Sequence, residues 1–367
     1  MTITKTPLRV SLLGGGTDFP GFFRQHGGYV LTTAVNRYVY VIVKERFDAK
    51  IRLSYSVTEL VDRVDDVRHD LVRECLRKAG ITGGIELATM ADIPSTGSGL
   101  GSSSAVTVGL LNALFQYAGN PQDEASLARM ACDVEITSLA RPIGMQDQYI
   151  AAYGGSRAIS WDVDGRAHVD RLDLCDETRR SLNERLLLFY TNQSRSSGTI
   201  LGEQLANIPN RTAELQRLKE LARYGRVALE SRRLDDFGRC LDDAWQVKRT
   251  LASGVTSPAI DGAYEAAKSA GALGGKIAGA GGGGFLLLYC PPESQTAVRA
   301  VLRDLPEMAF DLEDAGSQVL FHQRSRTTWI TGKQFQSLDH FRPVGPSRVS
   351  APTRSNGANA LARGESA

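Results

Sequence analysis

The chain has little of what marks secreted, metal-clustered or membrane-spanning proteins. Its 367 residues include five cysteines, and none of them are paired at metal-binding spacing. An odd number of cysteines in mostly apolar surroundings is typical of reduced thiols in a protein core. No uninterrupted apolar run reaches the ~18 residues of a membrane-spanning helix, and the first residues contain no apolar signal core. We therefore expect a cytoplasmic protein without a membrane segment.

An excess of charge of one sign is also lacking. Lysine and arginine number 43 and aspartate and glutamate 41, which gives a formal net charge of +2. Such a balance provides no long-range attraction to nucleic acid or to an anionic membrane, so we expect small-molecule partners instead. The length is that of about two domains, each large enough for its own core.

Two common nucleotide-binding motifs are absent. The Walker A pattern requires Gly-x4-Gly-Lys-Ser/Thr, but the lysine that ends Gly271–Lys276 is followed by Ile277. The dinucleotide pattern Gly-x-Gly-x-x-Gly fails by one position, because the glycines of residues 97–101 alternate strictly. No acidic residue closes a second strand about twenty residues later either. Walker-type and dinucleotide-binding folds are both poor fits.

The chain has instead a glycine- and serine-rich segment at Pro94–Ala105, between a strand-like apolar run and an apolar segment with helical spacing. Glycine permits close approach to a ligand, and a helix N-terminus supplies unpaired N–H groups and a positive dipole end. A flexible glycine–serine turn has the same composition, but the flanking elements favour a phosphate-binding loop. The residues expected to bind phosphate are Gly97, Ser98, Gly99, Leu100, Gly101, Ser102, Ser103 and Ser104.

Two more glycine-rich segments bracket this loop, Thr6–Asp18 near one end and Lys276–Phe285 near the other. Three such segments, each beside an apolar strand or helix, indicate backbone brought close to a ligand from several directions. In form and order the three segments resemble those of the GHMP kinases, the superfamily of galactokinase, homoserine kinase, mevalonate kinase and phosphomevalonate kinase. The resemblance covers about residues 1–330 and implies ATP as phosphate donor, Mg²⁺ as cofactor and a small-molecule acceptor.

The same resemblance implies a two-domain α/β and α+β fold, with a ribosomal-S5-domain-2-like N-terminal domain, a ferredoxin-like C-terminal domain and the ligands between them. Periodicity alone supports mixed helices and strands. We expect domains at 1–175 and 176–340 and a disordered tail at 341–367, which is rich in Pro, Ser, Arg, Asn and Gly. Strands are expected at 29–35, 38–43, 84–89, 156–161, 186–190 and 285–289, and helices at 65–78, 105–115, 123–139 and 258–269, with two more between 212 and 251 broken near Ser231.

Glu135 is the first candidate for chemistry. It follows apolar residues four and eight positions earlier, so a carboxylate shares the apolar face of the expected helix. A salt bridge at the edge of the core would explain this pattern equally well. In the resembled family a glutamate on this helix and a serine of the phosphate loop hold Mg²⁺, which implies Glu135 and Ser103 as metal ligands. The run of serines leaves Ser102 and Ser104 open for the same role.

Asp147 is the second candidate. It lies in Gly144–Tyr149, which resembles the family's Gly-x-x-Asp-Gln-aromatic segment, although an aspartate in a turn is commonly only a cap. In the galactokinase and mevalonate kinase branches this aspartate is the base that faces the acceptor hydroxyl. Arg9 matches the family's basic residue, although the small residue before it is absent here. The resemblance implies that Asp147 accepts a proton and that Arg9 stabilises the transferring phosphoryl group.

The first and last glycine-rich segments indicate the substrate class. Galactokinase-like chains carry Gly-Glu-His-Thr-Asp, whereas Gly14–Asp18 lacks the glutamate and histidine, which disfavours galactose. The segments, together with Trp245–Arg249, look most like the D-glycero-D-manno-heptose 7-phosphate kinase branch, which phosphorylates the anomeric C1 hydroxyl to give a 1,7-bisphosphate for nucleotide-activated heptose. The expected substrate-binding residues are Gly16, Thr17, Asp18, Gly281, Gly282, Lys248 and Arg195.

The basic residues decide between two sugar classes. A phosphorylated sugar needs a basic clamp, for which Lys248, Arg195 and Arg37 are candidates, although each alone is as readily a solvated surface cation. The fucokinase branch shares a Gly-Gly-x-Thr-Asp motif, so a neutral sugar such as fucose, which needs no clamp, is the alternative. A non-catalytic ATP- and sugar-binding regulator would have lost the base or the metal ligand, and Glu135 and Asp147 are both present. The oligomeric state stays open, a homodimer included.

Overall fold

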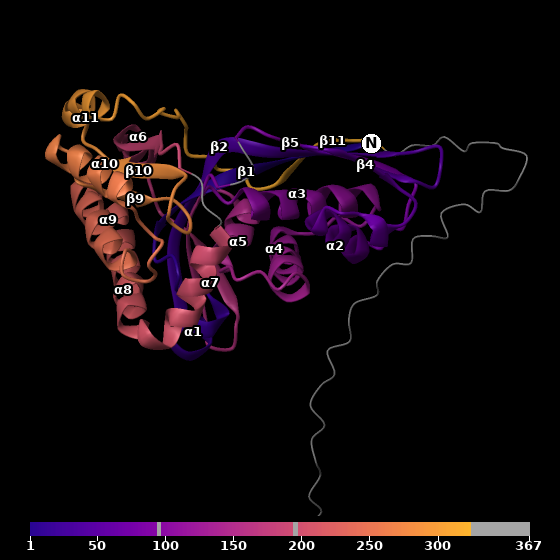
Figure 1. Ribbon diagram of the computed structural model, residues 1–367, viewed down its shortest axis with the longest axis horizontal. Helices are drawn as coiled ribbons and strands as arrows, with labels where there is room; N and C mark the ends of the chain where they lie inside the picture. Colours follow the sequence, from indigo (N-terminus) through magenta and orange to yellow (C-terminus); the bar gives the residue numbers. More distant parts are fainter. Residues whose placement is uncertain (94–96, 194–196, 324–367) are drawn as a thin grey trace, which may run out of the picture.

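A computed structural model describes residues 1–93, 97–193 and 197–323 of the chain, which form two halves side by side (Figure 1). In chain order the elements are β1 Thr2–Leu13, α1 Pro20–His26, β2 Gly28–Glu45, β3 Ile51–Ser54, β4 Thr58–Val61, η1 Val64–Asp66, α2 Asp70–Ala79, β5 Ile85–Ala91, α3 Ser102–Tyr117, α4 Glu124–Cys132, η2 Asp133–Ser138, α5 Gln146–Tyr153, β6 Ser156–Trp161, β7 Ala167–Arg171, α6 Asp176–Arg185, β8 Leu186–Tyr190, α7 Ser197–Asn207, η3 Ile208–Asn210, α8 Thr212–Glu230, α9 Leu234–Lys248, α10 Pro258–Ser269, β9 Gly274–Ile277, β10 Phe285–Tyr289, η4 Pro292–Ser294, α11 Gln295–Val301 and β11 Gln318–His322.

The larger sheet is built around one long strand. Its order is β11-β1-β2-β5-β3-β4, with β6 and β7 joined to the first half of β2. The prediction of separate strands at 29–35 and 38–43 is wrong, because β2 runs unbroken for 18 residues. The polar pair Asn36–Arg37 that suggested a turn is an irregularity in the pairing with β1, where these two residues have no partner opposite.

Helices α2 to α5 cover one face of the larger sheet (Figure 1). The central one, α3, contacts β1 and β2 as well as α2, α4 and α5. This position explains its sequence, because a helix with neighbours on most sides is apolar all round and not amphipathic. The N-terminus of α3 follows directly on the phosphate loop, so packing of this helix holds the loop in place.

The smaller sheet belongs to the other half and has the antiparallel order β8-β10-β9. Both of its faces are buried, since Leu186 and Leu188 join the core shared with the larger sheet while Leu187 and Phe189 join a second core with α10 and α11. Phe189 also forms an isolated bridge with Glu307, on the side of β8 where a ferredoxin-like fold has its fourth strand. The expected fold class is confirmed.

Most local predictions agree with the observed elements. Four ranges coincide with β6, β8, β10 and α10, and the break near Ser231 separates α8 from α9. The helix expected at 123–139 is different in kind, because α4 ends at Cys132 and residues 133–138 continue as the π-helix η2. Among the described residues no helix combines the length and apolarity that a membrane span needs.

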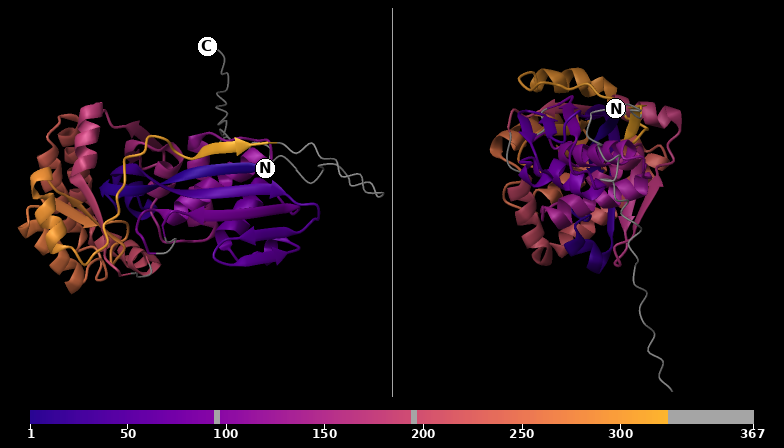
Figure 2. Two further views of the ribbon diagram at one scale, coloured as in Figure 1. Left: turned by 90° about the horizontal axis from the view of Figure 1, so that it is seen from above. Right: turned by 90° about the vertical axis from the view of Figure 1, so that its right-hand side faces the viewer.

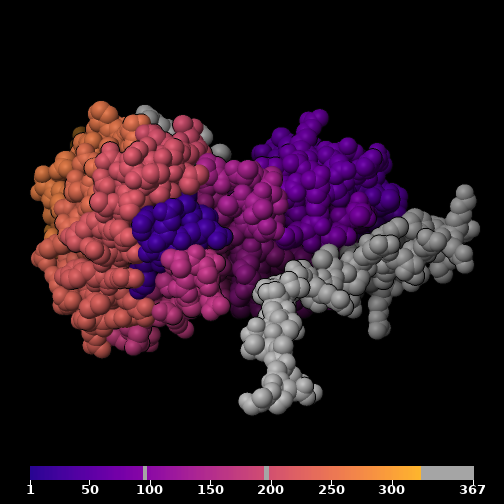
Figure 3. Space-filling view, turned by 90° about the horizontal axis from the view of Figure 1, so that it is seen from below, coloured from indigo at the N-terminus to yellow at the C-terminus, as the bar shows by residue number. Residues whose placement is uncertain are grey.

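Two segments of the chain contact the half to which they do not belong in sequence. Strand β11 pairs with the edge of β1, so the chain returns to the larger sheet after the smaller one is complete (Figure 2). In the opposite direction, α1 lies among residues of the C-terminal half (Figure 3), where Lys219 donates a hydrogen bond to the carbonyl of His26. The boundary at residue 175 stays a prediction, with β11 inside the second range but part of the first sheet. Residues 341–367 lie outside the described residues.

One close approach in the smaller sheet is open to test. A Cβ on Gly274 of β9 would lie 2.1 Å from the carbonyl oxygen of Gly238, in α9. We expect Gly274→Ala to lower the free energy of unfolding by about 1–3 kcal/mol, because a helix backbone cannot move aside as a side chain can. In Gly262→Ala, within α10, the new Cβ has no neighbour within 4 Å, and this control should be neutral or stabilising by about 0.5–1 kcal/mol. Equal stabilities of the two variants in chemical denaturation would contradict the prediction.

Candidate active site

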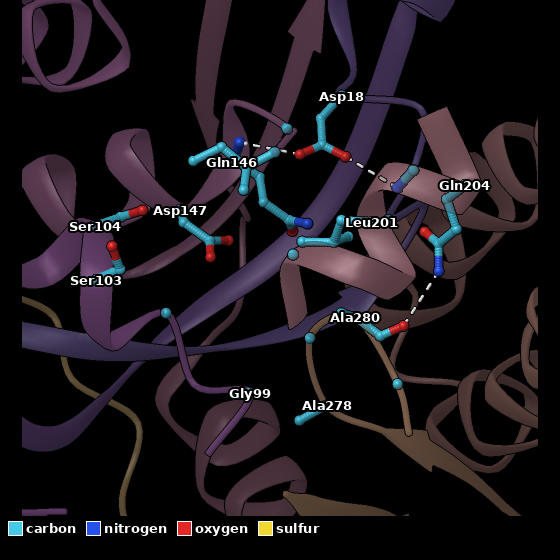
Figure 4. A pocket seen from close by; sticks show the side chains of 18 of the residues that line it. Asp18, Gly99, Ser103, Ser104, Gln146, Asp147, Leu201, Gln204, Ala278 and Ala280 are labelled. Atoms are coloured by element: carbon cyan, nitrogen blue, oxygen red, sulfur yellow. Dashed lines mark hydrogen bonds between the residues drawn. The ribbon is translucent and has the colours of Figure 1, made fainter. Parts of the chain in front are cut away.

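A cavity of about 370 Å³ lies between the two halves (Figure 4). Its wall is made by the start of the chain, the phosphate loop, the segment from Glu135 to Asp147, the helix α7 and the C-terminal glycine loop. All three glycine-rich segments therefore meet at one place, as the sequence predicted. The cavity is polar where the phosphate loop, Asp18 and Asp147 face it, and apolar at Leu201 of α7.

The phosphate loop has a backbone that glycine alone adopts readily. Gly97, Gly99 and Gly101 have φ angles of 75°, 76° and 76°, all in the left-handed region. The chain then enters α3 at Ser102, where the first N–H groups of a helix have no partner within the helix. This loop and helix end have the backbone geometry that suits an anion, and phosphate binding by them stays a prediction.

The C-terminal glycine loop lies directly against the phosphate loop. A Cβ on Gly99 would be 2.4 Å from the carbonyl oxygen of Ala278, and one on Gly279 would be 2.8 Å from the Cα of Gly99. The backbone N–H of Phe285 donates to the carbonyl of Ser98 at 3.2 Å. Backbone meets backbone here, which explains why both segments consist of glycine and other small residues.

Glu135 is fully buried in η2. Its carboxylate accepts hydrogen bonds from the hydroxyls of Ser103 at 2.6 Å and Ser104 at 2.7 Å, and from Nε2 of Gln148 at 2.7 Å. Burial raises the pKa of Glu135, while these three donors act against the rise. A π-helical turn is uncommon and frequently marks a functional site.

The three serines that begin α3 differ in what they contact. Ser103 and Ser104 bond to Glu135, whereas the hydroxyl of Ser102 lies 3.1 Å from that of Ser98. The contacts therefore favour Ser103 or Ser104 over Ser102 as the partner of Glu135. Metal binding by this pair remains a prediction.

Arg9 and Asp147 form a two-point ion pair at the cavity wall. Arg9 Nε donates to Oδ1 of Asp147 at 2.7 Å and Nη2 donates to Oδ2 at 2.6 Å. Arg9 also donates from Nη1 to the carbonyl of Gly99 at 2.5 Å, so one guanidinium joins the carboxylate to the phosphate loop. Asp147 belongs to the first turn of α5 and its side chain keeps 23 % exposure, whereas Arg9 is buried. The carboxylate is fixed in direction yet open to a ligand.

Asp18 holds the turn that precedes α5. Its carboxylate accepts from the N–H groups of Gly16 at 2.9 Å and Gln146 at 3.2 Å. A Cβ on Gly144 would lie 1.9 Å from this carboxylate, so a glycine is needed there. Burial raises the pKa of Asp18 and the charge of Asp147 adds to the rise, while the bond from Gly16 lowers it. Asp18 lines the cavity mainly as an anchor of its neighbours.

Three residues expected to contact ligand are not part of the cavity wall. The hydroxyl of Thr17 is buried and donates to the carbonyl of Gly14 at 2.8 Å. Leu100 packs in the core, and Gly282 donates its N–H to Val255 at 2.7 Å, with its neighbours in the wall instead. These residues shape the segments that line the cavity, and their direct contact with a ligand stays a prediction.

The candidate basic clamp is reduced to one described residue. Lys248 lines the cavity, is almost fully buried and donates to the carbonyl of Gly279. Burial, and next the charge of Arg9, lower the pKa of Lys248 to about 8. Arg37 does not line the cavity; its guanidinium donates to the backbone carbonyls of Asn36 and Ala309, so the structure offers no support for it as part of the clamp. Arg195 lies outside the described residues.

Three polar side chains of the wall were not expected from the sequence. Gln146 is 9 % exposed, and its Oε1 has no hydrogen-bond partner among the described residues, although Figure 4 has the side chain directed into the cavity. Gln204 of α7 donates to the carbonyl of Ala280 at 3.1 Å. Arg141 reaches the phosphate loop from the segment between Glu135 and Asp147. The adjacency of Gln146 to Asp147 was the one available signal.

Comparison with known proteins yields a family match in both halves. The model described as the GHMP kinases N terminal domain matches residues 67–155, and the model described as GHMP kinases C terminal matches residues 226–308. The first range contains the phosphate loop, Glu135 and Asp147, and the second contains Lys248 and the C-terminal glycine loop. The two models together cover most of the cavity wall, while the start of the chain and α7 lie outside both ranges.

Individual relatives agree with this match. The chain is similar to a D-glycero-alpha-D-manno-heptose 7-phosphate kinase of Campylobacter jejuni, with 27 % identity over 317 residues that cover 82 % of this chain and 92 % of that protein. It is similar to an L-fucokinase/L-fucose-1-P guanylyltransferase of Bacteroides fragilis at 26 % identity, covering 86 % of this chain and only 38 % of that longer protein. Among solved structures, a D-glycero-D-manno-heptose 1-phosphate kinase from Bacteroides thetaiotaomicron has a similar fold, with a TM-score of 0.74, 23 % identity, and coverage of 88 % of this chain and all of that one.

Fold, family models and relatives agree, because two of the three glycine-rich segments that meet at the cavity lie within the ranges that the two domain models match. The chain belongs to the GHMP kinase family and is a sugar kinase with ATP as its phosphate donor.

Proposed function

We propose that the chain transfers the terminal phosphate of ATP to the anomeric C1 hydroxyl of D-glycero-D-manno-heptose 7-phosphate. The observation that carries the proposal is the pairing of Arg9 with Asp147 beside the phosphate loop, in the cavity that Lys248 also lines. The similarity to a heptose 7-phosphate kinase over nearly its whole length supports the substrate class. Product formation at C1 serves the synthesis of nucleotide-activated heptose.

Asp147 is the proposed proton acceptor. Both of its oxygens receive N–H groups of Arg9, but a carboxylate has about four lone-pair sites, which leaves room for a sugar hydroxyl. In the reaction the acceptor oxygen forms a bond to the γ-phosphorus, the bond from this phosphorus to the β,γ-bridging oxygen breaks to leave ADP, and the hydroxyl proton passes to Asp147. Arg9 orients the carboxylate and, through Gly99, keeps it in register with the phosphate loop.

Ser103 and Glu135 fit the magnesium ion that such kinases use. They supply a hydroxyl and a carboxylate oxygen 2.6 Å apart at the cavity wall, and Mg²⁺ bound to a nucleotide usually takes only one or two oxygens from the protein. When bound, the ion neutralises charge on the phosphates of ATP. Ser104 and Gln148 would keep the Glu135 carboxylate oriented.

Lys248 and Gln146 are the proposed substrate-reading groups. The buried amine of Lys248 suits the phosphate of a sugar phosphate. The Oε1 of Gln146, which has no donor among the described residues, suits a sugar hydroxyl, because a buried acceptor without a donor is costly. A neutral sugar such as fucose is the second candidate. One contact favours it. Lys248 already donates to the carbonyl of Gly279, so its amine has a hydrogen-bond partner without a sugar phosphate.

The first test is ADP release with Mg-ATP against heptose 7-phosphate, mannose, fucose, galactose and mevalonate. We expect turnover with heptose 7-phosphate alone and a product phosphorylated at the anomeric carbon. Turnover with fucose and not with the heptose phosphate would replace the proposed substrate by the neutral sugar. Binding of sugar and ATP without any ADP release would favour a regulator.

Asp147→Asn tests the proton acceptor. The amide keeps the shape of the side chain but cannot accept the proton, so we expect kcat to fall on the order of 10²–10⁴-fold. ADP release at saturating substrates measures this directly. Asp62→Asn changes a carboxylate that is 75 % exposed in the same half and should leave kcat unchanged. A loss of only a few-fold in Asp147→Asn would reduce Asp147 to positioning the hydroxyl.

Lys248→Met tests the phosphate clamp. Because a hydrogen bond to a charged group is worth about 1.5–3 kcal/mol, we expect the KM for heptose 7-phosphate to rise about 10- to 100-fold, with the KM for ATP unchanged. Lys50→Met, at an exposed lysine, is the control with the same charge change. A parallel rise in both KM values would speak against a specific contact with the sugar phosphate.

The pH dependence of the same clamp has a definite sign. The pKa of Lys248 is lowered to about 8 by burial and by Arg9, against the opposing charges of Asp18 and Asp147. The amine therefore loses its proton as the pH rises through about 8, and the KM for heptose 7-phosphate should rise there. In Lys248→Met this rise should be absent. A wild-type KM that stays flat from pH 7 to 9 would contradict the charge assignment.

A further inference from the structure

Arg141 occupies an unusual position in the chain. It follows Ala140, whose φ of 50° lies in the left-handed region that non-glycine residues seldom adopt. The N–H of Arg141 donates to the backbone carbonyl of Glu135 at 3.0 Å, so the chain folds back on the end of η2. Such strained turns persist where the surrounding structure holds them, and they gather at functional sites. This one directs the side chain of Arg141 to the phosphate loop.

The guanidinium contacts the phosphate loop itself. Nη1 of Arg141 donates to the hydroxyl of Ser103 at 2.6 Å and lies 3.5 Å from the carboxylate of Glu135. Nη2 donates to Asp70, in the first turn of α2, at 2.9 Å. The side chain keeps 28 % exposure and lines the cavity, so it is held by Asp70 and still accessible to a ligand in the cavity.

Of the cationic side chains that line the cavity, Arg141 is the one best placed to bind a nucleotide. Residues 97–104 contain neither lysine nor arginine. Among the described residues three cationic side chains line the cavity. Arg9 is engaged at two points by Asp147, and Lys248 donates to a carbonyl of the opposite glycine loop. Arg141 is the member of this set that bonds to a side chain of the phosphate loop.

We propose that Arg141 binds the β- and γ-phosphates of the nucleotide and stabilises the charge of the group in transfer. The proposal deepens the proposed function and rests on its ATP site. A planar guanidinium matches two phosphate oxygens at once, and fixed cations around a transferring phosphoryl group contribute much of the catalysis in such reactions. Asp70 orients the guanidinium from the far side.

Nucleotide binding tests this without turnover. Titration calorimetry of the full chain with adenosine, AMP, ADP and a non-hydrolysable ATP analogue, in the presence of EDTA, separates phosphate contacts from base contacts. For Arg141→Ala we expect the Kd of ADP and of the analogue to rise about 10- to 100-fold, with adenosine unchanged within threefold. Arg141→Lys, which keeps the charge without the planar fork, should lie between wild type and Arg141→Ala.

Two variants separate this role from a structural tie between α2 and the loop. Arg77→Ala removes an exposed arginine of α2 with the same charge change and should bind every nucleotide as wild type does. Asp70→Ala removes the tie but keeps the guanidinium. Equal losses for adenosine and the analogue in Arg141→Ala, no loss for either, or an equal loss in Asp70→Ala would each overturn the proposal. Because no sugar is present, failure of the heptose assignment would leave this result unaffected.

Discussion

The cavity depends on the contact between two glycine-rich loops from opposite halves of the molecule. At Gly99 and Gly279 the main chains are so close that neither position has room for a Cβ. Backbone has no rotamers, so a contact of this kind fixes the distance between the phosphate loop and the opposite wall more rigidly than side-chain packing would. Arg9 extends the same link, since it bonds to both Gly99 and Asp147. The nucleotide side and the acceptor side of the cavity thus share one frame.

Within that frame the protein holds charged groups out of water. Lys276, which donates to the carbonyl of Leu12 at 3.2 Å, is buried near Lys248 and Arg9, and burial holds its pKa well below the usual range. Burial raises the pKa of Glu135 and of Asp18, because it disfavours the charged form of an acid as it does that of an amine. Clusters of this sort cost stability and are found mainly where chemistry uses them. Each group has hydrogen-bond partners, and this limits the cost.

The sequence predicted the parts of this site that depend on local chemistry. The phosphate loop and Glu135, which line the cavity, could be predicted because the glycine pattern and the helix spacing are visible along the chain. Asp147, which lines it too, was predicted because its segment resembles that of the GHMP kinases. Arg141 was missed because its role depends on a left-handed turn at Ala140, which no residue type announces. Thr17 and Leu100 were expected to bind substrate and phosphate, and their side chains are buried, because position in a motif does not tell which side chains face inward. The long strand β2 was divided in two because Asn36–Arg37 has the composition of a turn, and only the partner strand reveals otherwise.

Strand β11 has a consequence for how the protein is made. It completes the edge of β1, the first strand of the chain, from a position after every element of the smaller sheet. During synthesis the edge of β1 therefore stays unpaired until the strands of the smaller sheet, and then β11, have left the ribosome. A pairing between residues so distant in sequence raises the contact order, and a high contact order goes with slow folding. Completion of the larger sheet therefore depends on synthesis of the smaller one. An N-terminal fragment that ends before the smaller sheet would lack β11, the strand that pairs with β1.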